Sequence, residues 1–348
     1  MIVSQTALQK EISKLPSSLE FVRAKKYRGL LRTNKELRNL YRLETGAIGE
    51  EKVFNLFKSE GRNHWMVLCN LWMDDDRSFE CDFLVITSYC VYTFEIKHLT
   101  GHFIYEDSSC EINGTKMDYD LIQQARKPYI KLRKILDRVS PVIPLKGGIV
   151  FTSDKNKVTI NSAVADIEVL QMSDLYEYIQ QMKKDETKNS DEKLPTSQLF
   201  KTFENYEIVD PFLPNPLSAE EMKIIRKGIY CAKCKKYGVE ITKNYVICRC
   251  GLHEPRIEAI VRTVCEYGVL NFDKHFTIKD IRVFTDYKHS HGYLKNILDT
   301  YFEGTFNHRY SYYHNIQRPF KEIQDSLDFK LPKLYYTSRK SPEIYIIE

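Results

Sequence analysis

The sequence has no apolar segment of the ~18 residues that a membrane-spanning helix needs. Its first residues, MIVSQTALQKEISKLPSSLEF, lack the basic start, apolar core and small-residue cleavage site of a secretory signal. The chain also lacks the Gly-x-x-x-x-Gly-Lys-Ser/Thr loop that cradles nucleotide phosphates, and it has no internal repeat. We therefore expect a cytoplasmic protein with no membrane partner, and any ATPase or helicase working with it would be a separate chain.

The chain also lacks a large excess of positive or negative charge. Lys and Arg number 52 against 47 Asp and Glu, which only weakly favours a polyanionic partner. The basic residues are concentrated, however, between Arg23 and Arg42, where a helical pattern holds one acid, Glu36. That pattern is typical of a solvated helix face, and it also fits a surface that faces phosphates.

The organisation along 348 residues indicates several domains. The pattern predicts, in order, a basic helical segment, an α/β domain, a linker with a connecting helix, a cysteine-rich module and a C-terminal helical domain: 1–45, 46–182, 183–229, 230–254 and 255–348. Within the α/β domain we expect a helix, three strands, a helix, a strand, and a final strand leading into a helix: 49–60, 65–72, 81–88, 89–97, 118–138, 147–153 and 167–182. These elements predict a mixed sheet flanked by helices.

Polar residues at the ends of two apolar strands are the informative feature of this domain. Asp82 begins the strand CDFLVIT, and Glu95 and Lys97 end the strand VYTFEIK. If the two strands pair as a hairpin, Asp82 and Glu95 lie at one end of the sheet and repel each other unless a cation sits between them. Mg²⁺ typically binds one or two carboxylates, waters and phosphate, and Lys97 beside it could stabilise developing negative charge.

This arrangement resembles the active-site signature of the PD-(D/E)xK nuclease superfamily, and within it the NERD (nuclease-related) domain. The resemblance covers about residues 46–182 and rests on GAIGEEKVFNLF, CDFLVIT, VYTFEIKHLTG, LIQQARKPYIKL, KGGIVFTS and LQMSDLYEYI, in that order. It implies a restriction-endonuclease-like mixed sheet flanked by helices. Two departures, Asp120-Leu121 ahead of the glutamine and His98 after Glu-x-Lys, remove no implied metal ligand and bear on substrate preference.

The resemblance also implies roles for individual residues. The implied metal ligands for Mg²⁺, or Mn²⁺ in its place, are Asp82, Glu95 and the backbone carbonyl of Ile96. Lys97 would position the attacking water, and Glu50 would support the metal or that water. Gln124 would contact the site from its helix.

Each of these residues also has an ordinary structural explanation. Glu95 and Lys97 could form a rim ion pair worth ~0–1 kcal/mol, and Asp82 could cap the turn before its strand. Glu50 could simply favour a helix N-terminus, and Gln124 could be plain helix surface.

Nine cysteines divide into two groups. Five are scattered through apolar contexts and are expected to be reduced core thiols: Cys69, Cys81, Cys90, Cys110 and Cys265. The other four form a CxxC pair and a CxC pair thirteen residues apart: Cys231, Cys234, Cys248 and Cys250. This spacing resembles a zinc ribbon with a closed, structural Zn²⁺ site, although His253 could replace one ligand and a redox disulfide is the alternative.

The C-terminal segment predicts three helices followed by a hairpin, which resembles a winged helix with 290–303 as recognition helix and 304–316 as wing. Candidate nucleic-acid contacts are Lys288, His291, Lys295 and Arg309, together with His289 and His308. Domains of this type also bind proteins.

The sequence therefore favours a metal-dependent nuclease that hydrolyses phosphodiester bonds, with DNA as the expected substrate. The ribbon and the winged-helix-like region would position it on the substrate or a partner. Two alternatives remain open, a non-cleaving nucleic-acid-binding or assembly protein and an RNA-directed nuclease. A homodimer is also compatible, because nucleases that cut duplexes often pair two sites.

Overall fold

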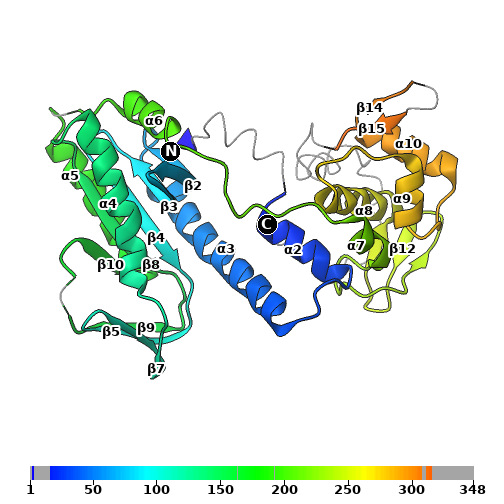
Figure 1. Ribbon diagram of the computed structural model, residues 1–348, viewed down its shortest axis with the longest axis horizontal. Helices are drawn as coiled ribbons and strands as arrows, with labels where there is room; N and C mark the ends of the chain where they lie inside the picture. Colours follow the sequence, from blue (N-terminus) through cyan, green and yellow to red (C-terminus); the bar gives the residue numbers. More distant parts are fainter. Residues whose placement is uncertain (1, 4–15, 163, 192, 308–310, 316–348) are drawn as a thin grey trace, which may run out of the picture. The chain divides into compact units, whose positions relative to one another are not determined.

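The computed structural model describes residues 2–3, 16–162, 164–191, 193–307 and 311–315. These residues divide into two compact units (Figure 1). Unit 1 contains described residues 2–3 and 33–213, and unit 2 contains residues 16–32 and those from 214 onward. No helix among the described residues is long and apolar enough to cross a membrane.

Unit 1 is built on a mixed six-stranded sheet in the order β1-β2-β3-β4-β8-β10. Its strands are β1 (Ile2–Val3), β2 (Met66–Asp75), β3 (Arg77–Ile86), β4 (Val91–Lys97), β8 (Leu145–Phe151) and β10 (Ile167–Gln171). Strands β2, β3 and β4 form an antiparallel meander, and β8 and β10 continue the sheet parallel to β4. The expected mixed α/β fold is confirmed.

Helices cover both faces of this sheet. On one face, α3 (Asn34–Glu60) and α5 (Met172–Lys188) place Val53, Phe57 and Ile179 in a core with Phe83 and Phe94. The other face is covered by α4 (Leu121–Val139) and α6 (Thr196–Glu204), whose Leu132, Leu136 and Phe203 pack on the strands. Most of these side chains are fully buried, so the sheet is rigidly held between two apolar layers.

A second, four-stranded sheet in the order β7-β6-β5-β9 was not expected from the sequence. It consists of β5 (Gly101–Glu106), β6 (Ser109–Ile112), β7 (Thr115–Lys116) and β9 (Asn156–Ile160). Phe103, Tyr105 and Cys110 pack under the first turns of α4, beside Leu121 and Ala125. The sheet therefore supports the end of α4 that is nearest to the end of β4.

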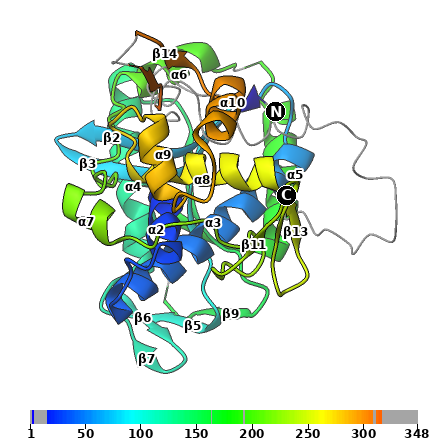
Figure 2. The ribbon, with the colours of Figure 1, turned by 90° about the vertical axis from the view of Figure 1, so that its right-hand side faces the viewer.

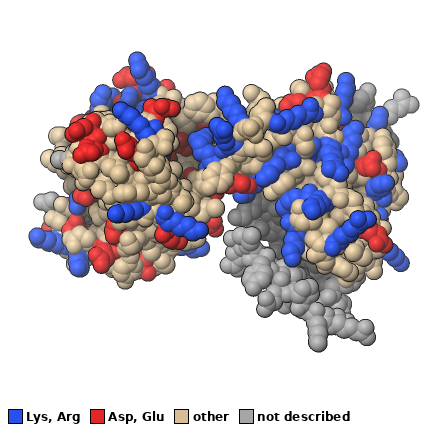
Figure 3. Space-filling view, turned by 90° about the horizontal axis from the view of Figure 1, so that it is seen from below, with Lys and Arg blue, Asp and Glu red and all other residues tan. Residues whose placement is uncertain are grey.

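Unit 2 combines the N-terminal helix α2 (Ser18–Tyr27) with the C-terminal half of the chain (Figure 2). After α7 (Ala219–Ile224) come a small antiparallel sheet, three helices and a hairpin: β11 (Glu240–Ile241), β12 (Tyr245–Ile247), β13 (His253–Pro255), α8 (Arg256–Leu270), α9 (Ile278–Phe284), α10 (His291–Tyr301), β14 (Gly304–Thr305) and β15 (Tyr312–Tyr313). Lys and Arg side chains gather on the face of unit 2 that Figure 3 shows.

Three helices and a hairpin follow one another in unit 2, namely α8, α9, α10 and the strands β14 and β15. Phe276, just before α9, forms a β-bridge with Tyr313 of β15, which also pairs with β14. An isolated bridge before the second helix thus joins the two-stranded sheet that follows the third. Leu294, Ile297 and Leu298 bury the inner face of α10 against this core.

The N-terminal helical region falls in both units. A capping box of Thr33 and Glu36 starts α3, which then runs without interruption through the expected domain boundary at residue 45. The helix before it, α2, packs on α8, and its Arg28 is buried against Glu266. The compact units therefore divide the first 45 residues between them, where the sequence suggested one segment.

Candidate functional site

The sheet opens between β3 and β4 where Asp82 and Glu95 lie. The backbone ladder between these strands ends at the pair Phe83–Phe94, and the next pair in that register would be Asp82 with Glu95. Instead, Oδ2 of Asp82 accepts a hydrogen bond from the Ile96 backbone N–H at 2.8 Å. A carboxylate thus takes the place of a ladder bond, and both acids face the gap at the sheet edge.

The Ile96 carbonyl points into the same gap. The neighbouring Lys97 carbonyl accepts from the Thr152 N–H at 2.9 Å, on the β8 side of the strand. Because successive residues of a strand direct their N–H and C=O groups to opposite sides, Ile96 directs both groups toward β3. This orientation fits the implied role of Ile96 as a metal ligand.

Lys97 and Glu95 form an ion pair at the end of β4, with 2.5 Å between Nζ and Oε1 and side chains only 20% and 12% exposed. Burial disfavours the charged lysine, but the carboxylates of Glu95 and Asp82 outweigh it and raise the pKa of Lys97. The pair is more enclosed than a rim ion pair, so the lysine is fixed as a cation beside the two acids.

For Asp82 the balance is opposite, because Lys97 and the Ile96 N–H favour its charged form but do not outweigh burial. Loss of hydration raises the pKa of Asp82 well above its usual range, and repulsion by Glu95 raises it further. A bound cation would stabilise the charged form of a buried carboxyl group that lies beside a second carboxylate. Carboxylate and carbonyl oxygens are the ligands that Mg²⁺ prefers. The donor set of Asp82, Glu95 and the Ile96 carbonyl therefore fits a hard divalent cation.

Helix α3 brings Glu50 to this edge because Gly49 permits a close approach. A Cβ atom on Gly49 would lie 2.7 Å from Oγ1 of Thr152 and 3.0 Å from Cβ of His98. Glu50 accepts a hydrogen bond from Nδ2 of Asn70 at 3.2 Å. Burial raises the pKa of Glu50, the bond from Asn70 opposes that rise, and the charge of Glu95 adds to it. Glu50 is thus electrostatically part of the same site.

Gln124 lies on the expected helix, half-buried in the second turn of α4. Asp120 caps this helix by accepting from the N–H groups of Ile122 and Gln123. Tyr119, which precedes the cap, is close enough to Lys97 to influence its pKa. The structure records no side-chain hydrogen bond of Gln124 within the described ranges, so its role stays a prediction.

Two acids near the site were not anticipated. Glu80 on β3 has its pKa raised to about 7 by loss of hydration first and then by the charges of Glu95, Asp210 and Glu50. Asp210 comes from the segment after α6, which runs beside β2 through a bridge between Met73 and Glu207. Glu80 could have been found from the motif FECD, where it stands two residues before Asp82. Nothing local in the sequence points to Asp210.

The four clustered cysteines converge in unit 2. Their sulfurs all lie within 4.8 Å of one another, with Cys231–Cys250 at 3.5 Å and Cys234–Cys248 at 3.6 Å. Tetrahedral Zn–S bonds of ~2.3 Å place sulfurs ~3.8 Å apart, so the cluster is compatible with zinc. His253 is not among the clustered ligands; it begins β13 and lies near Tyr245.

The candidate nucleic-acid contacts of the C-terminal helices differ in their surroundings. His291 and Lys295 are exposed on α10, and Lys295 pairs with Asp299 at 2.5 Å. Lys288 is exposed and lies 3.8 Å from Asp286. His289 was expected at the surface, but it is 3% exposed, and burial followed by the nearby Arg256 lowers its pKa to about 4. Arg309 and His308 lie outside the described residues.

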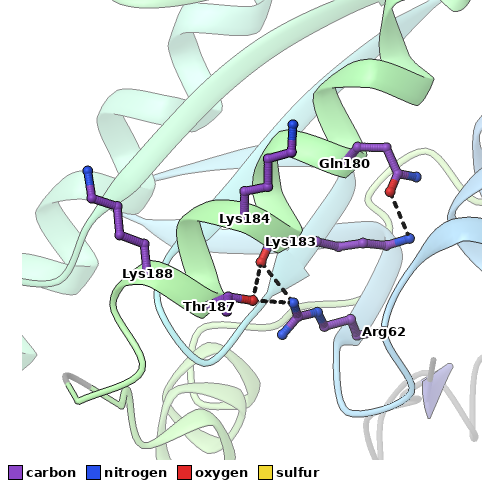
Figure 4. Close-up of a pocket in the computed structure, with 6 residues that line it drawn as sticks. All are labelled: Arg62, Gln180, Lys183, Lys184, Thr187 and Lys188. Carbon is purple, nitrogen blue, oxygen red and sulfur yellow. Dashed lines mark hydrogen bonds between the residues drawn. The ribbon is translucent and has the colours of Figure 1, made fainter.

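A pocket of about 390 Å³ lies elsewhere in unit 1, toward the C-terminal end of α5 (Figure 4). Its lining is mostly basic: Arg62, Gln180, Lys183, Lys184, Thr187 and Lys188. Arg62 is already bound to the Lys183 carbonyl, the Thr187 hydroxyl and Glu186, and none of the acids at the end of β4 lines this pocket. This pocket is therefore separate from the candidate site at the end of β4.

A comparison with protein families matches residues 45–152 to the nuclease-related domain, NERD. The chain carries a nuclease-related domain. The matched residues include the end of α3 with Glu50, the gap between β3 and β4, Gln124 on α4, and the strand β8. No curated protein and no solved structure matches the chain. The resemblance inferred from the sequence is thus confirmed over residues 45–152, and the remainder of the expected domain, to residue 182, lies outside the match.

Proposed function

We propose that the protein is a Mg²⁺- or Mn²⁺-dependent nuclease that hydrolyses phosphodiester bonds of DNA. The observation that carries the proposal is the opened β3–β4 ladder, where Asp82 and Glu95 face one gap beside the enclosed ammonium of Lys97. The nuclease-related domain supports nuclease-type chemistry at this gap.

In this proposal Asp82, Glu95 and the Ile96 carbonyl would hold the metal. When bound, a divalent cation lowers the pKa of a coordinated water and offsets phosphate charge. Lys97, oriented by Glu95, presents a fixed positive charge to the phosphate as negative charge develops on its oxygens. Glu50, held by Asn70, presents an acceptor to the proton of the attacking water.

The four-cysteine cluster would hold a structural Zn²⁺ and fix the ribbon, since four protein ligands leave no open position for catalysis. Unit 2 would then attach the enzyme to its substrate, with exposed Lys288, His291 and Lys295 as contacts of the winged helix. An ATPase or helicase partner would be a separate chain, and a homodimer would pair two sites on one duplex.

The test is a cleavage assay on plasmid, linear duplex, single-stranded DNA and RNA, each with Mg²⁺, Mn²⁺ or a chelator. We expect metal-dependent cutting of DNA that Glu95→Ala and Lys97→Ala each reduce by about a hundredfold or more. Matched controls are Glu168→Ala and Lys58→Ala, which remove exposed charges from β10 and the far end of α3. Equal cutting by the site variants and the controls would refute the assignment. Cutting confined to RNA, or binding without cutting under every metal, would establish one of the two alternatives.

A further inference from the structure

Helix α2 and the zinc ribbon share a cluster of tyrosines in unit 2. The ring of Tyr230 lies 5.5 Å from that of Tyr27 and 5.6 Å from that of Tyr237. The Tyr237 hydroxyl donates to the backbone carbonyls of Tyr27 and Arg226, both at 3.2 Å. These contacts fasten the helix to the first cysteine turn, so the two segments form one continuous surface.

Cations lie over these rings. The Arg226 guanidinium is 4.1 Å from the centre of the Tyr237 ring, and Nζ of Lys235 is 5.2 Å from that of Tyr27. Arg226 is exposed although its guanidinium lies over the Tyr237 ring, so its N–H groups remain accessible to a ligand. Lys26 and Lys236, both exposed, stand next to Tyr27 and Tyr237 in the chain. We name Lys26, Tyr27, Arg226, Lys235, Lys236 and Tyr237 the α2–ribbon surface.

Two acids of this region form ion pairs with buried arginines. Glu266 binds Arg28 and accepts from the Tyr230 hydroxyl at 3.0 Å, and Glu254 binds Arg262 at 2.9 Å. Both glutamates are buried. Within the described part of the chain, no carboxylate oxygen lies within 4.0 Å of the charged nitrogens of Arg226 or Lys235. The positive charge of the surface is therefore not offset locally.

The sequence of the ribbon adds to this surplus. Residues 226–250 contain seven Lys or Arg and one acid, Glu240. Four thiolates with one Zn²⁺ would contribute a net charge of −2, which leaves the segment with a net charge of +4. Figure 3 shows many Lys and Arg side chains on the face of unit 2 that it draws.

We propose that the α2–ribbon surface binds the phosphate backbone of a nucleic acid. The proposal rests on the proposed function for its choice of partner, and it assigns the main backbone anchor to α2 and the ribbon, in addition to the contacts proposed for α10. On α10 and just before it, Lys295 and Lys288 already lie beside Asp299 and Asp286. Stacked guanidinium groups and unpaired ammonium groups suit phosphate oxygens, and such contacts carry affinity without sequence preference.

The test measures binding apart from cutting. The full-length, zinc-containing protein carries Glu95→Ala in every sample, and fluorescence anisotropy follows a short labelled DNA duplex at several salt concentrations. The test variant adds Arg226→Gln and Lys235→Gln. The control adds Lys274→Gln and Lys279→Gln, which remove two charges from exposed positions of the same unit.

Because each lost phosphate contact lowers the salt slope by about 0.9, the test variant should lose about two units of slope. It should also bind roughly tenfold more weakly near 0.1 M salt, whereas the control should stay within about twofold of the parent. Arg226→Lys alone, which keeps the charge, should keep the parent slope. Zinc content and thermal unfolding confirm that each variant is folded.

An unchanged affinity and slope in the test variant would overturn the proposal, as would an equal loss in the control. Competition by polyglutamate at the same concentration as DNA would also overturn it and favour an acidic protein partner. If the parent enzyme cuts nothing but the test variant loses DNA binding, the nuclease proposal fails and this one stands. If the parent cuts DNA and the test variant binds normally, this proposal fails alone.

Discussion

Gly49 offers a direct test of how closely α3 must approach the sheet. A Cβ at this position would meet Thr152 Oγ1 at 2.7 Å, His98 Cβ at 3.0 Å and Ile96 Cγ2 at 3.3 Å. Two of these neighbours belong to the site strand or directly follow it, so Gly49→Ala must push α3 away from the end of β4. Glu50 is the next residue and would move with the helix.

The expected size follows from two opposing effects. Alanine in a helix interior is favoured over glycine by about 0.5–1 kcal/mol. Overpacking a tight core costs about 1–3 kcal/mol. Gly49→Ala should therefore destabilise unit 1 by up to about 2 kcal/mol, and a displacement of Glu50 by about 1 Å could lower the cleavage rate by about a hundredfold.

Gly46 supplies a matched control on the same helix. A Cβ there would find only Oε1 of Glu50 at 3.9 Å, which is ordinary contact. Gly46→Ala should thus gain about 0.5–1 kcal/mol and leave the rate near that of the parent. Urea unfolding and single-turnover cleavage of both variants make the comparison. If Gly49→Ala is as stable and as active as Gly46→Ala, the close approach does not position Glu50 and the reasoning fails.

Three further predictions concern the rest of the chain. Burial opposes ionisation of Glu186, but hydrogen bonds from Ser88, His64 and Trp65 lower its pKa from 4.5 to about 2. Glu186→Gln should therefore destabilise the protein by up to about 3 kcal/mol at pH 7. In urea unfolding, this difference in stability should shrink as the pH falls from about 4.5 toward 2. Arg28→Met should destabilise unit 2 by about 3–5 kcal/mol by leaving Glu266 buried without its cation, and adding Glu266→Leu should restore much of the loss in thermal unfolding. Freshly purified protein should contain one zinc, and Cys231→Ser or a strong chelator should remove it and expose the ribbon to proteolysis; zinc-free protein with an intact ribbon would contradict this.

Much of unit 1 could be predicted because its strands are apolar runs bounded by turns. The meander of β2, β3 and β4 and the placement of Asp82 near Glu95 follow from such local patterns. The small second sheet could not be predicted in the same way. Its strands are short and partly polar, and β5 pairs with β9 across an intervening helix, so only tertiary contact defines it.

The segment against which an amphipathic helix packs also cannot be predicted from the helix's own sequence. The residues of α2 predict that one face is buried, but they do not say on which part of the chain. In the structure the end of α2 is held by Arg28, which donates to the carbonyls of Arg226 and Gly228 as well as to Glu266. Asp210 was missed for the same reason, because its importance comes from a long-range approach to Glu80 and not from its neighbours in sequence.

The candidate active site and the α2–ribbon surface have opposite charge, which explains why the chain would need both. At the end of β4, the mutual effects of Glu50, Glu80, Asp82, Glu95 and Asp210 are opposed chiefly by Lys97. Such a site repels phosphate, and a divalent cation reduces that repulsion only in part. Affinity for a polyanionic substrate must then come from elsewhere in the chain, and an unoffset basic surface is the feature able to supply it. The α2–ribbon surface has the charge that the candidate active site lacks, so binding and cutting should depend on different residues.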